Sequence, residues 1–219
     1  RHMDYGVQFN KLMYERLIAG ENITLFSPSD VPGLYNAFFE DQDKFRELYE
    51  KAERMTSIRK KSMPAIELFS SFMQERKDTG RIYLMNVDHA NTHGAFVEEV
   101  APIKQSNLCS EITLPTNEER TAVCCLSSLN LEKYDEWKDD PDMISDVMRF
   151  LDNVLSDFIN KAPDQFKDAK YSAERERSVG LGVMGFHSFL QKNRIPLESV
   201  MAKSWNKKIF KNIHEKVNQ

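Results

Sequence analysis

Cysteine is scarce in this chain: there are three, Cys109, Cys124 and Cys125, and two of them are adjacent. An odd number this small excludes a secreted scaffold held by disulfides and favours reactive thiols in a reducing compartment. Long apolar runs are also missing, since no segment approaches the roughly 20 apolar residues that span a bilayer. No charged-then-apolar signal segment opens the chain. We therefore expect a cytoplasmic protein with no membrane partner.

Neither positive nor negative charge predominates in this chain. Lys and Arg number 30 against 34 Asp and Glu, which gives a formal net charge of -4, and no basic stripe marks a surface for a phosphate backbone. Nucleic acid is therefore not an expected partner. With 41% hydrophobic residues and no repeat or Gly/Pro-rich linker, residues 1–219 are expected to form a single domain.

Helical and extended patterns alternate along the sequence, which predicts an α/β fold. The first residue is not Met and the last helical stretch has no terminal capping residue, so both ends are expected to be cut from a longer chain. Residues 88–93 are expected to form a polar loop. Helices are predicted over residues 7–19, 35–55, 63–78, 142–160 and 198–217, and extended segments over residues 23–26, 81–87, 107–114 and 122–131.

The pattern Gly180-x-Gly182-x-x-Gly185 resembles a dinucleotide-binding turn. Such a turn must follow a hydrophobic strand, whereas here four charged residues at 174–177 precede it. Close packing of a helix and a strand through small residues is the interpretation we favour.

Asp88, His89 and His93 have a spacing seen in metal sites. Two histidines four residues apart share a face only on a helix, and this stretch is expected to be a loop. We therefore predict hydrogen-bonded loop histidines and no metal site.

The segment Asn107-Leu108-Cys109-Ser110-Glu111 is the strongest candidate for chemistry. In extended backbone alternate side chains share a face, so Asn107, Cys109 and Glu111 would project together at intervals of about 6.5–7 Å. An amide able to hold a substrate, a redox-active or nucleophilic thiol and a proton acceptor would then line one surface. On spacing alone, a buried cysteine between two polar neighbours remains the alternative.

A second extended run, residues 123–131, contains the other two cysteines and could bring a thiol toward Cys109. Adjacent side chains on a strand point to opposite faces. At most one of Cys124 and Cys125 is therefore expected to face the site, and the other is expected to lie in the core.

At these residues the chain resembles the large, catalytic subunit of class I ribonucleotide reductase of bacterial or phage type. The resemblance is strong from residue 1 to about residue 131 and thinner beyond. The segments that carry it are residues 1–8, ITLFSPSDVPGLY at 23–35, QER at 74–76, TGRIY at 79–83, NVDH at 86–89, NLCSEITLPT at 107–116, CCLSSLNL at 124–131 and GLGV at 180–183.

The resemblance implies a ten-stranded α/β barrel whose central finger loop carries the active cysteine, with residues 1–219 as an incomplete part of that domain. It implies that Cys109 forms the thiyl radical that removes the 3' hydrogen of a ribonucleotide. Glu111 would accept the 3'-hydroxyl proton, and Asn107 would bind the substrate by hydrogen bonds. Cys124 corresponds to one half of the redox pair that supplies reducing equivalents, whereas Cys125 has no catalytic role in the family.

The resemblance also implies partners. They are a ribonucleoside diphosphate substrate, a metal-containing small subunit that supplies the radical, thioredoxin or glutaredoxin, and a second copy in a homodimer. ATP and deoxynucleotide effectors bind the full-length family protein, and no cofactor or metal is expected in this chain. The partner of Cys124 and other parts of the site would lie outside residues 1–219.

The chain alone is therefore expected to be inactive, either as a fragment of a longer polypeptide or as one piece of a split enzyme assembled with other fragments. Two alternatives stay open. One is another barrel radical enzyme, such as an anaerobic reductase or a glycyl-radical lyase. The other is a noncatalytic helical interaction domain.

Overall fold

The computed structural model describes residues 3–218. They divide between two compact units, the first up to Asn117 and the second from Glu118 onward, and each has its own core.

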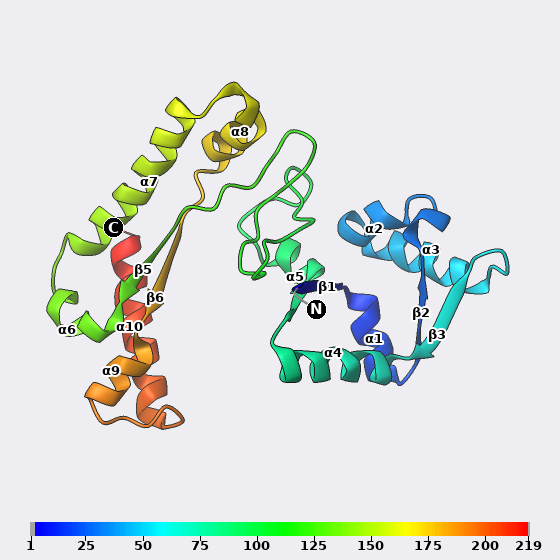
Figure 1. The fold of residues 1–219 in the computed structure, drawn as a ribbon, viewed down its shortest axis with the longest axis horizontal. Helices are drawn as coiled ribbons and strands as arrows, with labels where there is room; N and C mark the ends of the chain where they lie inside the picture. The colour runs from blue at the N-terminus through cyan, green and yellow to red at the C-terminus, as the bar shows by residue number, and fades with distance from the viewer. Residues whose placement is uncertain (1–2, 219) are drawn as a thin grey trace. The chain divides into compact units, whose positions relative to one another are not determined.

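Helices and strands alternate along the first unit (Figure 1). Two of its strands, β1 and β4, pair in parallel, and the other two, β2 and β3, pair antiparallel. Residues 93–117, which follow the last helix of this unit, contain neither helix nor strand. The elements are β1 (Tyr5–Phe9), α1 (Lys11–Ala19), β2 (Asn22–Phe26), the 3-10 turn η1 (Pro28–Asp30), α2 (Leu34–Glu40), α3 (Gln42–Arg54), β3 (Lys60–Pro64), α4 (Ala65–Thr79), β4 (Ile82–Asn86) and α5 (Val87–Thr92).

The first predicted helix begins later than expected. Residues 7–9 belong to β1, and α1 starts after Asn10, whose side-chain oxygen accepts a hydrogen bond from the Met13 amide at 3.3 Å. Phe9 is fully buried and stacks on Phe69 of α4. Phe9 stands at helical spacing from the apolar residues of α1, although it belongs to β1. The spacing of apolar residues therefore predicted a start of the helix that is too early.

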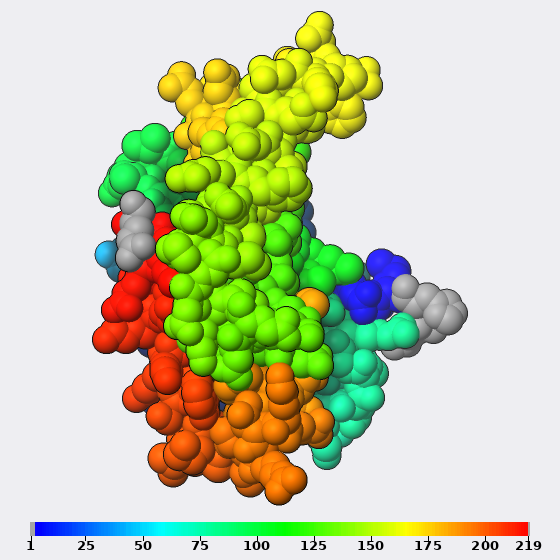
Figure 2. All heavy atoms as spheres, turned by 90° about the vertical axis from the view of Figure 1, so that its left-hand side faces the viewer, coloured from blue at the N-terminus to red at the C-terminus, as the bar shows by residue number. Residues whose placement is uncertain are grey.

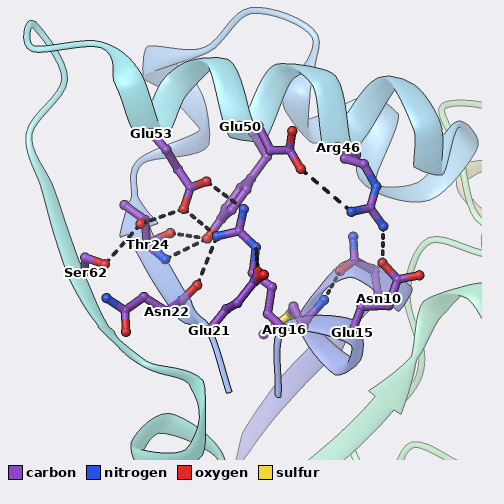
Figure 3. Close-up of polar contacts among 12 residues, drawn as sticks. Asn10, Glu15, Arg16, Glu21, Asn22, Thr24, Arg46, Glu50, Glu53 and Ser62 are labelled. Atoms are coloured by element: carbon purple, nitrogen blue, oxygen red, sulfur yellow. Dashed lines mark hydrogen bonds and ion pairs between the residues drawn. The ribbon is translucent and has the colours of Figure 1, made fainter. Parts of the chain in front are cut away.

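A partly buried ion pair joins α1, β2 and α3 (Figure 3). The guanidinium of Arg16 binds the Glu53 carboxylate through two hydrogen bonds of 2.6 and 2.7 Å. Thr24 Oγ1 donates to the same carboxylate at 2.8 Å, and Tyr49 Oη bonds to both the amide and the carbonyl of Thr24. The cluster borders a largely apolar cavity of about 210 Å³ between α1, β2 and α3.

We expect Glu53→Gln to lower the stability of the region where α1, β2 and α3 meet, and to remove part of the pH dependence of that stability. Burial would raise the pKa of Glu53, but hydrogen bonds from Arg16 and Thr24, with the charges of Arg16 and Lys60, outweigh it and hold the pKa below its usual value of 4.5. The stability contributed by this carboxylate is therefore present above about pH 4.5 and is lost as the pH falls through the lower pKa of the folded state. Amide hydrogen exchange of Thr24 in the complete subunit should report a loss of about 1–2 kcal/mol at pH 7.

The matched control is Glu15→Gln, because Glu15 pairs with Arg46 and both side chains are about 40% exposed. An exposed pair of this kind contributes less than about 1 kcal/mol. Equal effects from the two substitutions would contradict a larger contribution from the partly buried pair of Arg16 and Glu53.

The second unit contains one parallel pair of strands, β5 and β6, and the two long helices α7 and α10. α7 and α10 contact each other and form much of the surface of this unit in Figure 2. The elements are β5 (Leu126–Asn130), η2 (Leu131–Lys133), α6 (Tyr134–Trp137), α7 (Met143–Lys161), η3 (Asp164–Phe166), α8 (Lys167–Glu176), β6 (Gly180–Met184), α9 (Phe186–Lys192) and α10 (Val200–Val217).

The prediction of a helix over 142–160 is confirmed by α7, which buries Ile144, Leu151 and Leu155 on one stripe.

The glycine pattern at residues 180–185 does not form a dinucleotide-binding turn. Gly180 and Gly182 lie inside β6, and a Cβ at Gly180 would come within 2.4 Å of the Leu126 side chain on the neighbouring strand. The absence of a side chain there allows close packing of the strands β5 and β6. Small residues do serve close packing, but between two strands and not between a helix and a strand as predicted.

Gly185→Ala should destabilise the second unit by about 2–4 kcal/mol. Gly185 has a φ of 76°, which disfavours any side chain, and an added Cβ would lie 2.8 Å from Asn130 Oδ1 and 3.2 Å from the backbone nitrogen of Glu132. Asn130 cannot move away freely, because its Oδ1 accepts a 3.0 Å hydrogen bond from that nitrogen. Urea unfolding followed by fluorescence measures the effect, since both tryptophans of the chain, Trp137 and Trp205, lie in this unit.

The control is Gly182→Ala in the adjacent strand. A Cβ there would meet Ser128 Oγ at 3.5 Å, an ordinary contact, so the free energy of unfolding should change by less than about 1 kcal/mol. A loss as large as that of Gly185→Ala would show that the left-handed backbone is not the cause.

The six strands of residues 3–218 form three separate two-stranded sheets. These residues confirm an alternating α/β arrangement, and the closed ten-stranded barrel implied by the resemblance is not seen in them. In the same described residues no helix has the length and apolar character needed to cross a membrane.

Candidate active site

The segment with Asn107, Cys109 and Glu111 forms a tight turn in the first unit. The Ser110 amide donates to the Asn107 carbonyl at 3.1 Å, and Ser110 has a left-handed backbone with a φ of 63°. The prediction of extended backbone over 107–114 is therefore wrong. Alternate side chains of a strand share a face, but across a turn of this kind the spacing of side chains no longer follows that rule.

The turn nevertheless brings together two of the three predicted side chains. Asn107 Nδ2 donates a 2.7 Å hydrogen bond to Glu111 Oε1, whereas in a strand these residues would lie about 13 Å apart. The same amide accepts a 3.1 Å bond from the Ile112 nitrogen through Oδ1. The amide of Asn107 is thus oriented at both of its polar atoms.

Cys109 lies within this turn, between the two paired residues, and its side chain is exposed. The thiol is accessible to a substrate or to another segment of protein. Shielding from water, which reactive intermediates require, is not supplied by the turn itself.

Cys124 and Cys125 lie in the second unit, just before β5. Cys124 is exposed and Cys125 is buried, which confirms that one of the two belongs to the core. The Cys125 thiol donates to the Leu151 carbonyl of α7 at 3.4 Å. Burial, together with the adjacent Cys124, raises the pKa of Cys125, so its thiolate is disfavoured and its reactivity is low.

The expected polar loop over 88–93 is wrong, because residues 87–92 form helix α5. The helix is held by the buried Asn91, whose amide nitrogen donates to the Val87 and Ile103 carbonyls and whose oxygen accepts from the Ile103 nitrogen. A pattern of polar residues gives little sign of such long-range bonds.

His89 on this helix and His93, which caps its end, lie side by side with ring centroids 5.2 Å apart. His93 Nδ1 lies 2.8 Å from Thr92 Oγ1, so one ring is engaged in a local hydrogen bond. Asp88 instead accepts a bond from the Lys11 amide, and burial raises its pKa although that bond opposes the rise. Within residues 3–218 no three His, Cys, Asp or Glu side chains are arranged to hold a metal ion.

Ser106 is a further polar residue of this region, and its place in the sequence pattern predicts no role for it. Its Oγ donates to the Ile112 carbonyl at 2.6 Å and lies 3.3 Å from Asn107 Oδ1. A serine at the start of a turn is a common source of such local side-chain bonds, and that is the signal by which it could have been found.

Comparisons with known proteins identify several relatives. A family model described as the ribonucleotide reductase barrel domain matches residues 1–217. The chain is 52% identical over 205 residues to the ribonucleoside-diphosphate reductase subunit alpha of Haemophilus influenzae, a match that covers 89% of this chain and 26% of that protein. It is 44% identical over 203 residues to the subunit alpha of Enterobacteria phage T4, covering 88% of this chain and 26% of the phage protein.

Among solved structures, the alpha subunit of the Actinobacillus ureae class Id ribonucleotide reductase matches with a TM-score of 0.71 and 32% identity. The match covers 98% of this chain and 34% of that one. A fold of the barrel type is thereby supported for the described residues. This chain spans about a quarter of the length of the curated relatives it matches.

Proposed function

This chain belongs to the ribonucleotide reductase barrel-domain family, and from that membership we propose that it forms part of the catalytic subunit of a ribonucleoside-diphosphate reductase. The observation that carries the proposal is the turn at Cys109, where an amide and a carboxylate are held 2.7 Å apart beside an exposed thiol. Such a group can remove a hydrogen atom, accept a proton and bind a hydroxyl at one place on a sugar.

Cys109 is the proposed site of the thiyl radical. The sulfur takes the hydrogen atom from C3' of the ribose, which leaves an S–H bond and a radical centred on C3'. At the end of the cycle the same hydrogen atom returns to C3' and the thiyl radical is restored. Net consumption of the radical is therefore zero.

Glu111 is the proposed base for the 3'-hydroxyl proton. The Asn107 amide nitrogen carries two hydrogens, so it can keep its bond to Glu111 Oε1 and donate the second hydrogen to a substrate oxygen. The hydrogen bond also aligns the carboxylate before the substrate binds, which lowers the cost of arranging the groups.

Cys124 is the proposed member of a dithiol pair. Loss of the 2'-hydroxyl as water and its replacement by hydrogen require two electrons and two protons, and two thiols supply them as they become a disulfide. Thioredoxin or glutaredoxin would then reduce that disulfide. The exposure of Cys124 supports this role because the thiol can be reached by a partner.

The remaining parts of the proposal follow from the family. The ten-stranded barrel would enclose the turn at Cys109 as a finger loop and exclude water from it, with residues 1–219 as one incomplete domain. A metal-containing small subunit would supply the radical, the catalytic subunit would act as a cytoplasmic homodimer, and ATP or deoxynucleotides would regulate it. The chain by itself would then be inactive. Family membership disfavours a noncatalytic helical domain, and identity to diphosphate reductases disfavours an anaerobic reductase or a glycyl-radical lyase.

The test is to assay the complete catalytic subunit with its small subunit, thioredoxin and either a ribonucleoside diphosphate or the matching triphosphate in air. We expect deoxynucleotide from the diphosphate only, and none when the small subunit is left out. Product formed without a small subunit, or only in the absence of oxygen, would overturn the assignment to this subclass.

A further inference from the structure

Ser106 and Asn107, two consecutive residues, hold both backbone polar groups of Ile112. The Ser106 hydroxyl donates to the Ile112 carbonyl at 2.6 Å, and the Ile112 nitrogen donates to Asn107 Oδ1 at 3.1 Å. The base of the turn at Cys109 is therefore closed by side chains. No helix or strand lies within residues 93–117 to do so.

Ile112 directly follows Glu111, so the two bonds fix the backbone from which the Glu111 carboxylate projects. The planar amide of Asn107 links them, since its oxygen is held by Ile112 and its nitrogen donates to Glu111 at 2.7 Å. Rotation of Ile112 away from Ser106 would turn this amide and break its contact with the carboxylate.

The turn needs such support because of its backbone. Ser110 adopts a left-handed conformation, which costs about 1–2 kcal/mol for a residue with a Cβ. A segment with this cost and no sheet or helix to hold it depends on its own hydrogen bonds. The hydroxyl of Ser106 makes the shortest of the hydrogen bonds that close the turn.

From this geometry we infer that Ser106 is a positioning residue that keeps Asn107 and Glu111 in contact. The inference rests on the proposed function, because it assigns Ser106 a part in the step at which Glu111 accepts a proton. Ser106 acts through Glu111 and need not touch the substrate.

The experiment compares Ser106→Ala and Ser106→Thr in the complete subunit with its small subunit and thioredoxin. Loss of one neutral hydrogen bond should lower kcat by about 3- to 10-fold in Ser106→Ala, and threonine, which keeps the hydroxyl, should restore it. Ser145→Ala is the matched control, since it removes a similar hydroxyl-to-carbonyl bond, from Ser145 Oγ to the Asp142 carbonyl at 2.9 Å, at a residue of α7 that lies outside this turn. Its kcat should stay within about twofold of wild type.

A double-mutant cycle separates positioning from a merely structural role. If Ser106 acts through the carboxylate, Ser106→Ala should cause no further loss of kcat in a Glu111→Gln background. Full additivity of the two losses would overturn the inference.

A second readout does not depend on activity. The Ile112 amide should exchange with deuterium about 3- to 10-fold faster in Ser106→Ala, because its acceptor on Asn107 is no longer held in place. An active wild-type enzyme with unchanged kcat and unchanged exchange in Ser106→Ala would overturn the inference alone. A wild-type assembly that forms no deoxynucleotide would overturn the proposed function, and the positioning role with it.

Discussion

Cys109→Ser should abolish deoxynucleotide formation by the complete assembly, with a loss of at least about 1000-fold, equivalent to about 4 kcal/mol in the barrier. Serine is close to cysteine in size and shape, but its O–H bond is stronger than an S–H bond, so an oxygen radical cannot form at the same cost. Because Cys109 is exposed on a turn, the substitution should leave the fold and substrate binding unchanged. The measurement is the rate of product formation at saturating substrate.

Cys125→Ala is the control for this experiment. Cys125 is a buried thiol without a proposed catalytic role, so its removal should cost stability of about 1 kcal/mol and leave most of the activity. A Cys109→Ser enzyme that retained reduction, or a Cys125→Ala enzyme that folded but lost it, would contradict the assignment of the radical cysteine.

Cys124→Ser should also stop turnover, by about 1000-fold or more, but at a later step. Removal of the 3' hydrogen by Cys109 needs no electrons from the dithiol pair, so this first step should remain. In Cys124→Ser, the radical signal of the small subunit should be lost more slowly with substrate deuterated at C3' than with ordinary substrate. In Cys109→Ser the signal should persist with either substrate. Electron paramagnetic resonance follows this signal.

Two results would contradict the proposed order of steps. One is full turnover of Cys124→Ser with thioredoxin as the reductant. The other is a radical signal in Cys124→Ser that persists unchanged when substrate is added, because the variant would then be blocked before the 3' hydrogen is removed.

The sequence predicted the elements whose signal is local. α7 carries an apolar stripe at helical spacing, and that stripe is what it buries. β1 was missed because its partner β4 lies about 77 positions further along the chain, a distance at which periodicity carries no information. The expected helix over 35–55 is interrupted at Asp41, whose side chain caps α3 by accepting from the Lys44 amide at 2.9 Å.

The candidate site was predicted by residue type but not by shape. Asn107 and Glu111 do meet, yet they do so because Ser110 reverses the backbone, and a serine gives no sign in the sequence that it will adopt a left-handed conformation. The alternation of side chains along a strand predicted that Asn107 and Glu111 lie together, but in the structure a turn, not a strand, brings them into contact. Ser106 was missed because its importance lies in one bond to a backbone carbonyl six residues away.

Cys125 is buried and bonded to α7, and this affects which thiol can form a disulfide with Cys124 in the proposed dithiol pair. Two vicinal thiols that were both accessible could be joined to each other in a disulfide when an oxidant takes up their two electrons, and Cys124 would then be unavailable to the proposed dithiol pair. With the sulfur of Cys125 bonded to the backbone of α7 and its ionisation disfavoured, a disulfide between the two neighbours is disfavoured, and Cys124 is left to pair with a more distant thiol. The packing of the second unit thus distinguishes the two adjacent sulfurs, and a substitution on α7 that exposed Cys125 is expected to increase formation of a Cys124–Cys125 disulfide at the expense of the proposed pair.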